Sequence, residues 1–175
     1  MSGRGPRWGG GRGGRRDRDE PPPAVDPMAR AMGLLARREH SARELARKLA
    51  DGGAEADAIA ATLSELGDRD LQSDQRFAEL LVRSRIARGQ GPIAIASELR
   101  SHGVDDANAR AAVEAQTVDW AERARELCSR RFGASLGDPA GRRRCAAFLQ
   151  RRGFPGALVR EVLAGFSLTG ESDDD

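Results

Sequence analysis

Residues able to carry out chemistry are few in this chain of 175 residues, and none lies in a pattern typical of an active site. The two histidines, His40 and His102, are far apart in the sequence and stand beside polar turn residues, where an exposed side chain is expected. The chain contains no H-E-x-x-H pair, no G-x-x-x-x-G-K-[ST] loop and no G-x-S-x-G turn. We therefore predict that the protein is not an enzyme and uses no metal or cofactor.

The cysteines and the apolar segments indicate the cellular compartment. Cys128 and Cys145 are too few for a disulfide scaffold and lack C-x-x-C spacing. No apolar run approaches the roughly 18 residues that span a bilayer, and no hydrophobic stretch follows the basic start of the chain. We expect a cytoplasmic protein without membrane contact, in which both cysteines are free, partly buried thiols.

Ionic binding is the chemistry that remains. The formal net charge is only +2, but nearly all the basic residues are arginine and Lys48 is the single lysine. Arginine suits bidentate contacts to phosphate or carboxylate, although a GC-rich genome would produce the same bias. Residues 1–20 hold six Arg and seven Gly, which fits either a loose nucleic-acid-binding arm or a solubilising extension.

Arginines also gather at the end of a predicted helix over 74–88 and around the last predicted turn. Each could belong to an ordinary solvated helix face, but together they favour an elongated anionic partner, either nucleic acid or a protein filament wound on it. The candidate partner-binding residues are Arg83, Arg85, Arg88, Arg143, Arg151 and Arg152.

The segments that must position these arginines repeat with a period of fifty residues. Residues 45–63, 95–113 and 148–163 each carry an apolar residue four positions before a glycine and two more, six and ten positions after it. Three copies in register indicate a tandem repeat in which each copy is the joint of a helix–turn–helix. The matching positions are Leu49, Leu99 and Leu149, followed by Gly53, Gly103 and Gly153.

Helical periodicity begins at Met28, and no stretch shows sustained strand alternation. Ser41 and Glu44 predict a capping box, in which each side chain satisfies the other residue's backbone N–H. The helix over 74–88 is expected to bury Phe77, Leu80 and Leu81. Other helix starts are predicted at Ser73 or Asp74, Gly91–Pro92, Asp105, Asp138–Pro139 and Pro155.

These elements predict an all-α fold of three tandem three-helix repeats that form an elongated, curved array. The predicted repeats span 28–72, 73–117 and 118–167, with a disordered arm over 1–27 and an acidic tail over 168–175. A unit of about 45 residues buries little surface alone, so its neighbours or a partner must help to stabilise it. A monomer fits such a linear array best.

Three stretches, 34–49, 74–104 and 148–154, resemble the bacterial RecX family, and the similarity spans about 28–166. The first linker departs from the family pattern, because Gln72 and Ser73 stand where an acidic run is more usual; we expect this to alter capping rather than function. The matching residues are Leu35, Arg38, Ser41, Glu44, Leu45 and Leu49, then Asp74, Arg76, Phe77, Ala78, Arg83, Gly89, Gly91, Pro92, Ile95, Glu98, Leu99 and Gly103, then Phe148, Leu149, Arg152, Gly153 and Phe154.

The resemblance implies a regulator that binds along the RecA filament on single-stranded DNA, within the helical groove, and suppresses ATP hydrolysis and strand exchange. An array of helical units suits such a groove because successive units can contact successive subunits, and linked weak contacts gain from effective concentration. The resemblance does not identify the contact residues, so the six candidate arginines are predicted from charge alone.

Two other classes of function stay open. A helix–turn–helix DNA reader would present Arg, Asn or Gln at the start of each third helix. The corresponding segments, AEADAI, VDDANA and FPGALV, are mostly acidic or apolar, although sequence-independent binding to single- or double-stranded DNA remains compatible with them. The second class is a structural adaptor that binds another protein without affecting any enzyme.

Overall fold

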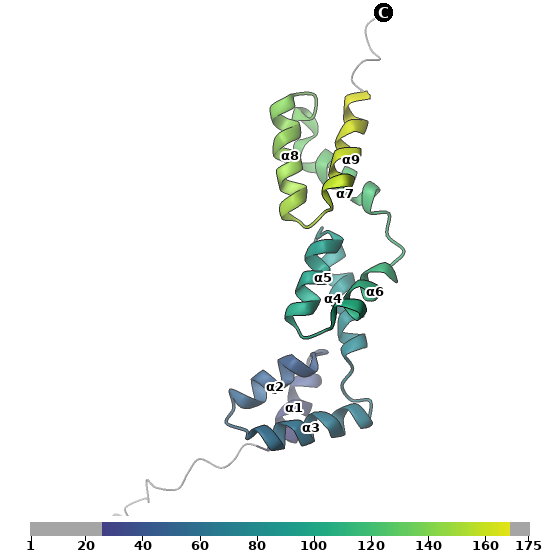
Figure 1. The fold of residues 1–175 in the computed structure, drawn as a ribbon. Helices are drawn as coiled ribbons and strands as arrows, with labels where there is room; N and C mark the ends of the chain where they lie inside the picture. Colours follow the sequence, from purple (N-terminus) through teal and green to yellow (C-terminus); the bar gives the residue numbers. More distant parts are fainter. Residues whose placement is uncertain (1–25, 169–175) are drawn as a thin grey trace, which may run out of the picture.

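The computed structural model describes residues 26–168, and every regular element in that range is helical. Figure 1 shows three compact groups of helices that follow one another along an elongated molecule. The predicted all-α array of three-helix repeats is confirmed. The helices are α1 (Pro27–Leu35), α2 (Ala42–Ala50), α3 (Ala56–Asp68), α4 (Asp74–Ala87), α5 (Pro92–Ser101), α6 (Asp106–Glu114), α7 (Trp120–Phe132), α8 (Pro139–Arg151) and α9 (Gly156–Leu168), with a short 3₁₀ turn, η1 (Gly133–Ser135).

Each group of three consecutive helices forms its own unit, in which the helices pack chiefly against one another. The apolar residues form three separate cores, one in each unit. Leu49, Leu99 and Leu149, the leucines of the fifty-residue repeat, are fully buried in the three cores. The ring of Trp120 touches both the second and the third core and so links these two units.

The predicted helix starts are largely confirmed. The side chains of Ser73, Asp105 and Asp138 accept backbone N–H groups in the first turns of α4, α6 and α8, and Gly91 precedes α5. Ser41 likewise accepts the N–H of Glu44 at 3.1 Å. The reciprocal half of the predicted capping box does not form, because the Glu44 carboxylate binds Arg38 instead.

The prediction that Leu80 is buried is wrong. Phe77 and Leu81 face the second core as expected, but Leu80 is 46% exposed. Val82 is fully buried in its place, because the α4 face that meets α5 and α6 passes through Ala78 and Val82, four residues apart. Leu80 therefore lies outside the core as a large apolar side chain on the surface.

The prediction of free thiols is also wrong, because Cys128 and Cys145 form a disulfide. Cys128 lies on α7 and Cys145 on α8, two helices that pack together in the third unit, and their Cα atoms are 6.1 Å apart. Both residues are fully buried. The two cysteines are seventeen positions apart in sequence, so only the packing of α7 on α8 brings them within bonding distance.

In the described range, the helices are all too short or too polar to cross a lipid bilayer.

Candidate functional site

The second and third units meet where the turn after α8 reaches the start of α5. The N–H groups of Gly91 and Ile93 donate to the carbonyl oxygens of Arg152 and Gly153, at 2.7 and 3.0 Å. N–H groups in the first turn of a helix have no partner within the helix, so the third unit satisfies donors that α5 leaves free. A Cβ on Gly153 would lie 2.4 Å from the Cβ of Ala94, and Gly153 has a φ of +84°. Only glycine meets both conditions.

The first and second units meet in a corresponding way. The N–H of Ala42, at the start of α2, donates to the carboxylate of Asp74 on α4 at 2.8 Å. A Cβ on Gly103 would lie 2.9 Å from the Cβ of Arg43 in the first turn of α2. The glycine of the repeat therefore packs against the second helix of the preceding unit. Around Gly53 of the first unit, the described part of the chain places no atom within 4 Å of such a Cβ.

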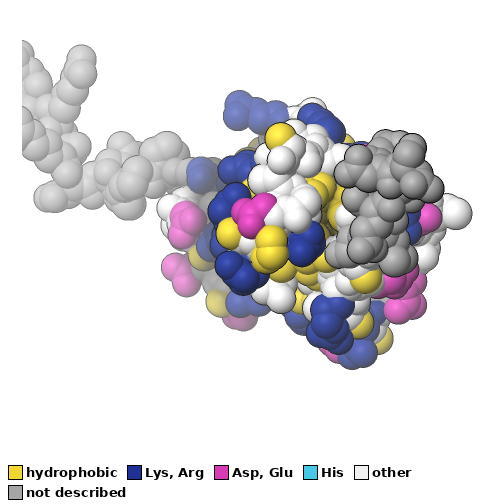
Figure 2. All heavy atoms as spheres, turned by 90° about the horizontal axis from the view of Figure 1, so that it is seen from above, with side chains coloured by type: hydrophobic (Ala, Val, Ile, Leu, Met, Phe, Trp, Pro, Cys, Tyr) yellow, Lys and Arg dark blue, Asp and Glu magenta, His cyan; other side chains and the backbone are white. Residues whose placement is uncertain are grey.

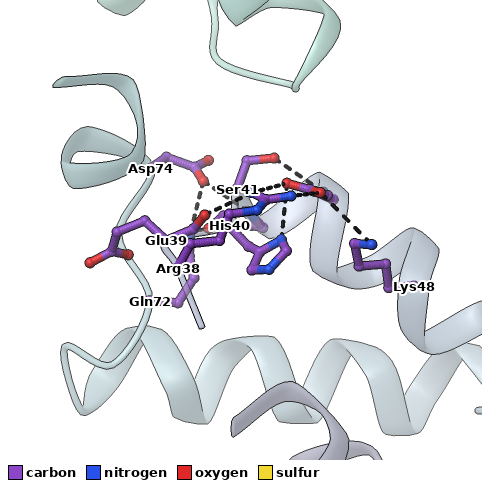
Figure 3. A network of polar contacts seen from close by, with 9 residues as sticks. Arg38, Glu39, His40, Ser41, Lys48, Gln72 and Asp74 are labelled. Atoms are coloured by element: carbon purple, nitrogen blue, oxygen red, sulfur yellow. Dashed lines mark hydrogen bonds and ion pairs between the residues drawn. The ribbon is translucent and has the colours of Figure 1, made fainter. Parts of the chain in front are cut away.

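A buried polar cluster lies beside the joint of the first two units (Figure 3). The Glu44 carboxylate accepts two hydrogen bonds from Arg38, at 2.6 and 3.1 Å, and lies 3.0 Å from Nδ1 of His40. Burial disfavours the ionised carboxylate, but the bonds from Arg38 and the proximity of His40 outweigh it and lower the pKa of Glu44 to about 2. The expectation that His40 is exposed is wrong, because its side chain lies under this carboxylate with 3% of the residue accessible.

Polar contacts extend this cluster into the linker between the units. Gln72 donates to the carboxylate of Asp74 at 2.7 Å and to the carbonyl of His40 at 3.3 Å. Arg76 on α4 donates to Glu39 at 2.9 Å. Of the two unusual residues of the first linker, Ser73 caps α4, while Gln72 helps to tie α4 to the first unit (Figure 3).

The six arginines predicted from charge are not gathered on one surface. Arg85 is half-buried and donates two hydrogen bonds to the carboxylate of Glu98 on α5, at 2.5 and 2.7 Å. This bond to Arg85 lowers the pKa of Glu98, so the pair is ionised and compensated within the second unit. Arg83 lies about 200° from Arg85 around the axis of α4. Arg83, Arg143 and Arg151 are exposed and make no ion pair within residues 26–168.

Arg88 and Arg152, by contrast, meet across the joint of the second and third units. Nη1 of Arg152 donates to the carbonyl oxygen of Arg88 at 2.7 Å. Beside this contact lies a hollow of about 360 Å³, which we call the joint hollow. Five arginines line it, together with Ala87, Gly89, Leu127 and Phe148: Arg88 after α4, Arg123, Arg130 and Arg131 on α7, and Arg152 after α8.

Sequence reasoning did not assign Arg123, Arg130 and Arg131 to the binding site. Their spacing could have indicated the site. Arg130 and Arg131 follow Arg123 by seven and eight positions, so all three lie on one face of the helix, with Leu127 between them. The position of Arg123 depends on the joint between the second and third units, because its guanidinium donates there to the carbonyl of Ile86 on α4 at 3.2 Å.

A second hollow, the α4 groove, lies between the first unit and the side of α4, and its volume is about 410 Å³. Exposed Leu80 lines it together with Arg38 from the first unit and Arg88 at the end of α4. Because Arg88 lines both hollows, they adjoin, and one surface runs along α4 from the first unit to the third.

Seen from the end of the array formed by the third unit, basic side chains lie in several separate groups, with apolar and acidic side chains between them (Figure 2). The positive charge visible from this end is therefore divided, and charge alone does not mark one continuous face.

Tandem three-helix units joined through glycine turns define a helical-repeat protein, and comparison with known proteins gives the family. Family models for the first, second and third three-helix domains of RecX match residues 28–66, 73–113 and 118–163. The chain belongs to the RecX family.

Similar curated proteins are named regulatory protein RecX. The one from Stenotrophomonas maltophilia strain K279a is 47% identical over 137 residues, which cover 78% of this chain and 84% of the relative. The one from Halorhodospira halophila is 49% identical over 137 residues, with coverage of 77% and 84%. The crystal structure of RecX from Lactobacillus salivarius has the same fold, with a TM-score of 0.73 at 23% identity over 81% of this chain and 95% of that chain. These relatives support a regulatory role for the family member described here.

Proposed function

We propose that this protein regulates RecA by binding the RecA filament on single-stranded DNA and lowering its ATPase and strand-exchange activity. The observation that carries the proposal is the continuous surface along α4, on which the α4 groove and the joint hollow adjoin at Arg88. An elongated partner lying on this surface would contact all three units, so contacts that are weak singly would be linked. The regulator acts by binding in the cytoplasm, as a monomer, and catalyses no reaction of its own.

Leu80 is the proposed apolar anchor of this surface, because it is a large exposed side chain in the α4 groove, which Arg38 and Arg88 also line. Buried apolar anchors supply much of the affinity of protein interfaces, whereas peripheral charges supply steering and orientation. The exposed arginines Arg83, Arg143 and Arg151 have the steering role in this proposal, and Arg88 and Arg152 lie at the joint itself. Arg85 acts indirectly, by holding Glu98.

The decisive experiment measures the DNA-dependent ATPase rate of RecA while this protein is titrated in at fixed single-stranded DNA and salt. Wild-type protein should lower the rate at amounts well below those that coat the DNA. Leu80→Ser should raise the half-inhibitory concentration at least about tenfold, the effect of removing an interface anchor. Ile93→Ser is the matched control, because Ile93 is also a large exposed apolar residue of the second unit but lies outside the α4 groove.

Charge reversal at Arg83, Arg143 and Arg151 should weaken inhibition mainly at low salt, because steering by surface charge is screened as salt rises. Arg85 is left unchanged, since its reversal would strand the carboxylate of Glu98. An unchanged ATPase rate with wild-type protein would contradict the proposal and favour the adaptor. Inhibition seen only at DNA-coating amounts would indicate simple competition for phosphates.

A further inference from the structure

We infer that the joint hollow is a binding site for a phosphodiester group of a nucleic acid strand. This site goes beyond the proposed function, because it requires only this chain and a nucleic acid and does not involve RecA. Nucleic acid bound here would lie across the joint of the second and third units, in contact with α7 and with the ends of α4 and α8.

Most of the charge inside the hollow lacks compensation. Five guanidinium groups line it and no carboxylate does. Arg123 pairs with Glu126 at 2.9 Å, whereas the other four arginines form no ion pair within residues 26–168. The Nε atom of Arg123 is buried and has no hydrogen-bond partner in the described structure. Like charges held close together, with a donor left unsatisfied, favour a bound anion.

Packing holds several of these guanidinium groups in place before any ligand arrives. Those of Arg131 and Arg152 lie 5.0 and 5.2 Å from the centre of the Phe148 ring, so each is attracted to the aromatic ring. Arg152 is further fixed by its bond to the carbonyl of Arg88, and Arg123 by its bond to the carbonyl of Ile86. Donors that are already ordered lose less conformational entropy when a ligand binds.

The arrangement favours phosphate over a carboxylate side chain. The donors come from three elements, and the two non-bridging oxygens of a phosphodiester, set on a tetrahedral phosphorus, can accept from guanidinium groups in several directions, whereas a planar carboxylate matches a single guanidinium fork. Phe148 is only 8% exposed and lies beneath the guanidinium groups, so it offers no open face on which a base could stack. Binding through phosphate alone carries no sequence information, so this site is indifferent to base sequence.

The test is fluorescence anisotropy of a labelled oligonucleotide of about 15 thymidines, a length that spans a typical single-strand site, without RecA. The full chain carrying Arg88→Gln and Arg130→Gln is compared with wild type. Both residues are exposed, and neither side chain forms a hydrogen bond or ion pair in the described structure, so the double variant should fold normally. The matched control is Arg144→Gln with Arg160→Gln, which removes the same charge from exposed positions that do not line the hollow.

The hollow variant should bind the oligonucleotide at least about tenfold more weakly, since each lost charge-assisted bond costs a substantial part of the affinity. The affinity of the hollow variant should also depend less steeply on salt concentration, because its binding releases fewer counterions from the oligonucleotide. The control variant should weaken binding less than about threefold, as expected for screened charges at a distance.

Equal losses in the two variants would overturn the assignment, because they would show that only net charge matters. A parallel titration with a labelled polyglutamate peptide addresses acidic protein as the ligand. If the hollow variant lost the peptide but kept the oligonucleotide, the phosphodiester site would be refuted. Because RecA is absent from both titrations, either result leaves the ATPase test of the proposed function unaffected.

Discussion

Glu44 shows how one residue can have two roles in such a small unit. Its position three residues after Ser41 marks the start of α2, but its carboxylate serves Arg38 and the buried His40 rather than the helix N-terminus. Lys48, one turn later on α2, lies 4.0 Å from the same carboxylate. Burial lowers the pKa of His40 despite the neighbouring Glu44, so His40 is neutral at neutral pH. The cluster is therefore built for an ionised Glu44 beside a neutral histidine.

The pH dependence of stability follows from these directions. The pKa of Glu44 falls from 4.5 in the unfolded chain to about 2 in the folded chain, so its stabilising contribution is complete above 4.5 and is lost as the pH falls toward 2. The pKa of His40 also falls on folding, so its contribution is present above 6.5 and declines as the pH drops below that value. Both groups make the folded chain less stable in acid.

We predict that Glu44→Gln lowers the free energy of unfolding by about 3 kcal/mol at neutral pH, and that this difference is roughly halved near pH 3 and approaches zero only as the pH falls below the folded pKa of about 2. The reason is that acid protonates Glu44 in the wild type and so removes the same charge. The measurement is urea denaturation of both proteins at each pH. Exposed Glu161, changed to Gln, is the control and should alter stability little. If the difference in unfolding free energy between wild type and Glu44→Gln stayed constant with pH, the ionised Glu44 carboxylate would not be its source.

Among the elements, the second helix of each of the first two units is completed by the unit that follows it. Asp74 of the second unit caps the N–H of Ala42 in α2, and carbonyl oxygens of the third unit cap α5. In the third unit, η1 lies against the start of α8, where a Cβ on Gly141 would collide with the carbonyl of Ser135. The third unit therefore covers the start of its second helix with its own residues.

We predict a graded response to alanine at the repeated glycines. Gly53 and Gly153 both have positive φ, so alanine at either should cost about 1–2 kcal/mol of unfolding free energy through backbone strain. At Gly153 the added Cβ also meets Ala94, which should cost about 1–3 kcal/mol more. Gly53→Ala is thus an internal control for strain alone.

Urea denaturation of the two alanine variants measures this difference directly. Hydrogen exchange adds the location, because Gly153→Ala should expose the amides of Gly91 and Ile93, which bond across the joint. Equal losses of stability in the two variants would show that the close approach of Gly153 to Ala94 adds nothing to the cost of the substitution.

At the scale of the whole molecule, stability is distributed over three cores rather than one. Each core is small, and the units touch through a few turns and polar clusters, so neighbouring units support one another pairwise. The third unit differs from the others because a disulfide ties α7 to α8 within its core. Reduction should therefore affect one end of the array first.

We predict that reduction lowers the stability of the third unit by about 3 kcal/mol, the value expected for a closed loop of this length. In hydrogen exchange, amides of α7–α9 should lose protection in reductant while those of α1–α3 keep it. The double variant Cys128→Ala with Cys145→Ala should be insensitive to reductant. If reductant destabilised that variant as much as the wild type, the disulfide would not be responsible.

Local signals in the sequence determined the helices, their caps and the threefold repeat. Ser73, Asp105 and Asp138 act on backbone groups a few residues away, and Leu49, Leu99 and Leu149 report the burial of their own helix faces. Interactions of such short range are specified by neighbouring residues, so spacing and residue type were enough to predict them. The resemblance to RecX rested on the same short motifs.

Tertiary structure alone decided which arginines act together and which groups are buried. Arg85 is compensated by Glu98 while Arg88 joins arginines of the third unit, although the two are only three residues apart on the chain. The exposure of Leu80, the burial of His40 and the disulfide likewise depend on partners from other helices. The physical reason is that charge compensation and burial depend on distances in space, and these are fixed only when the units pack together.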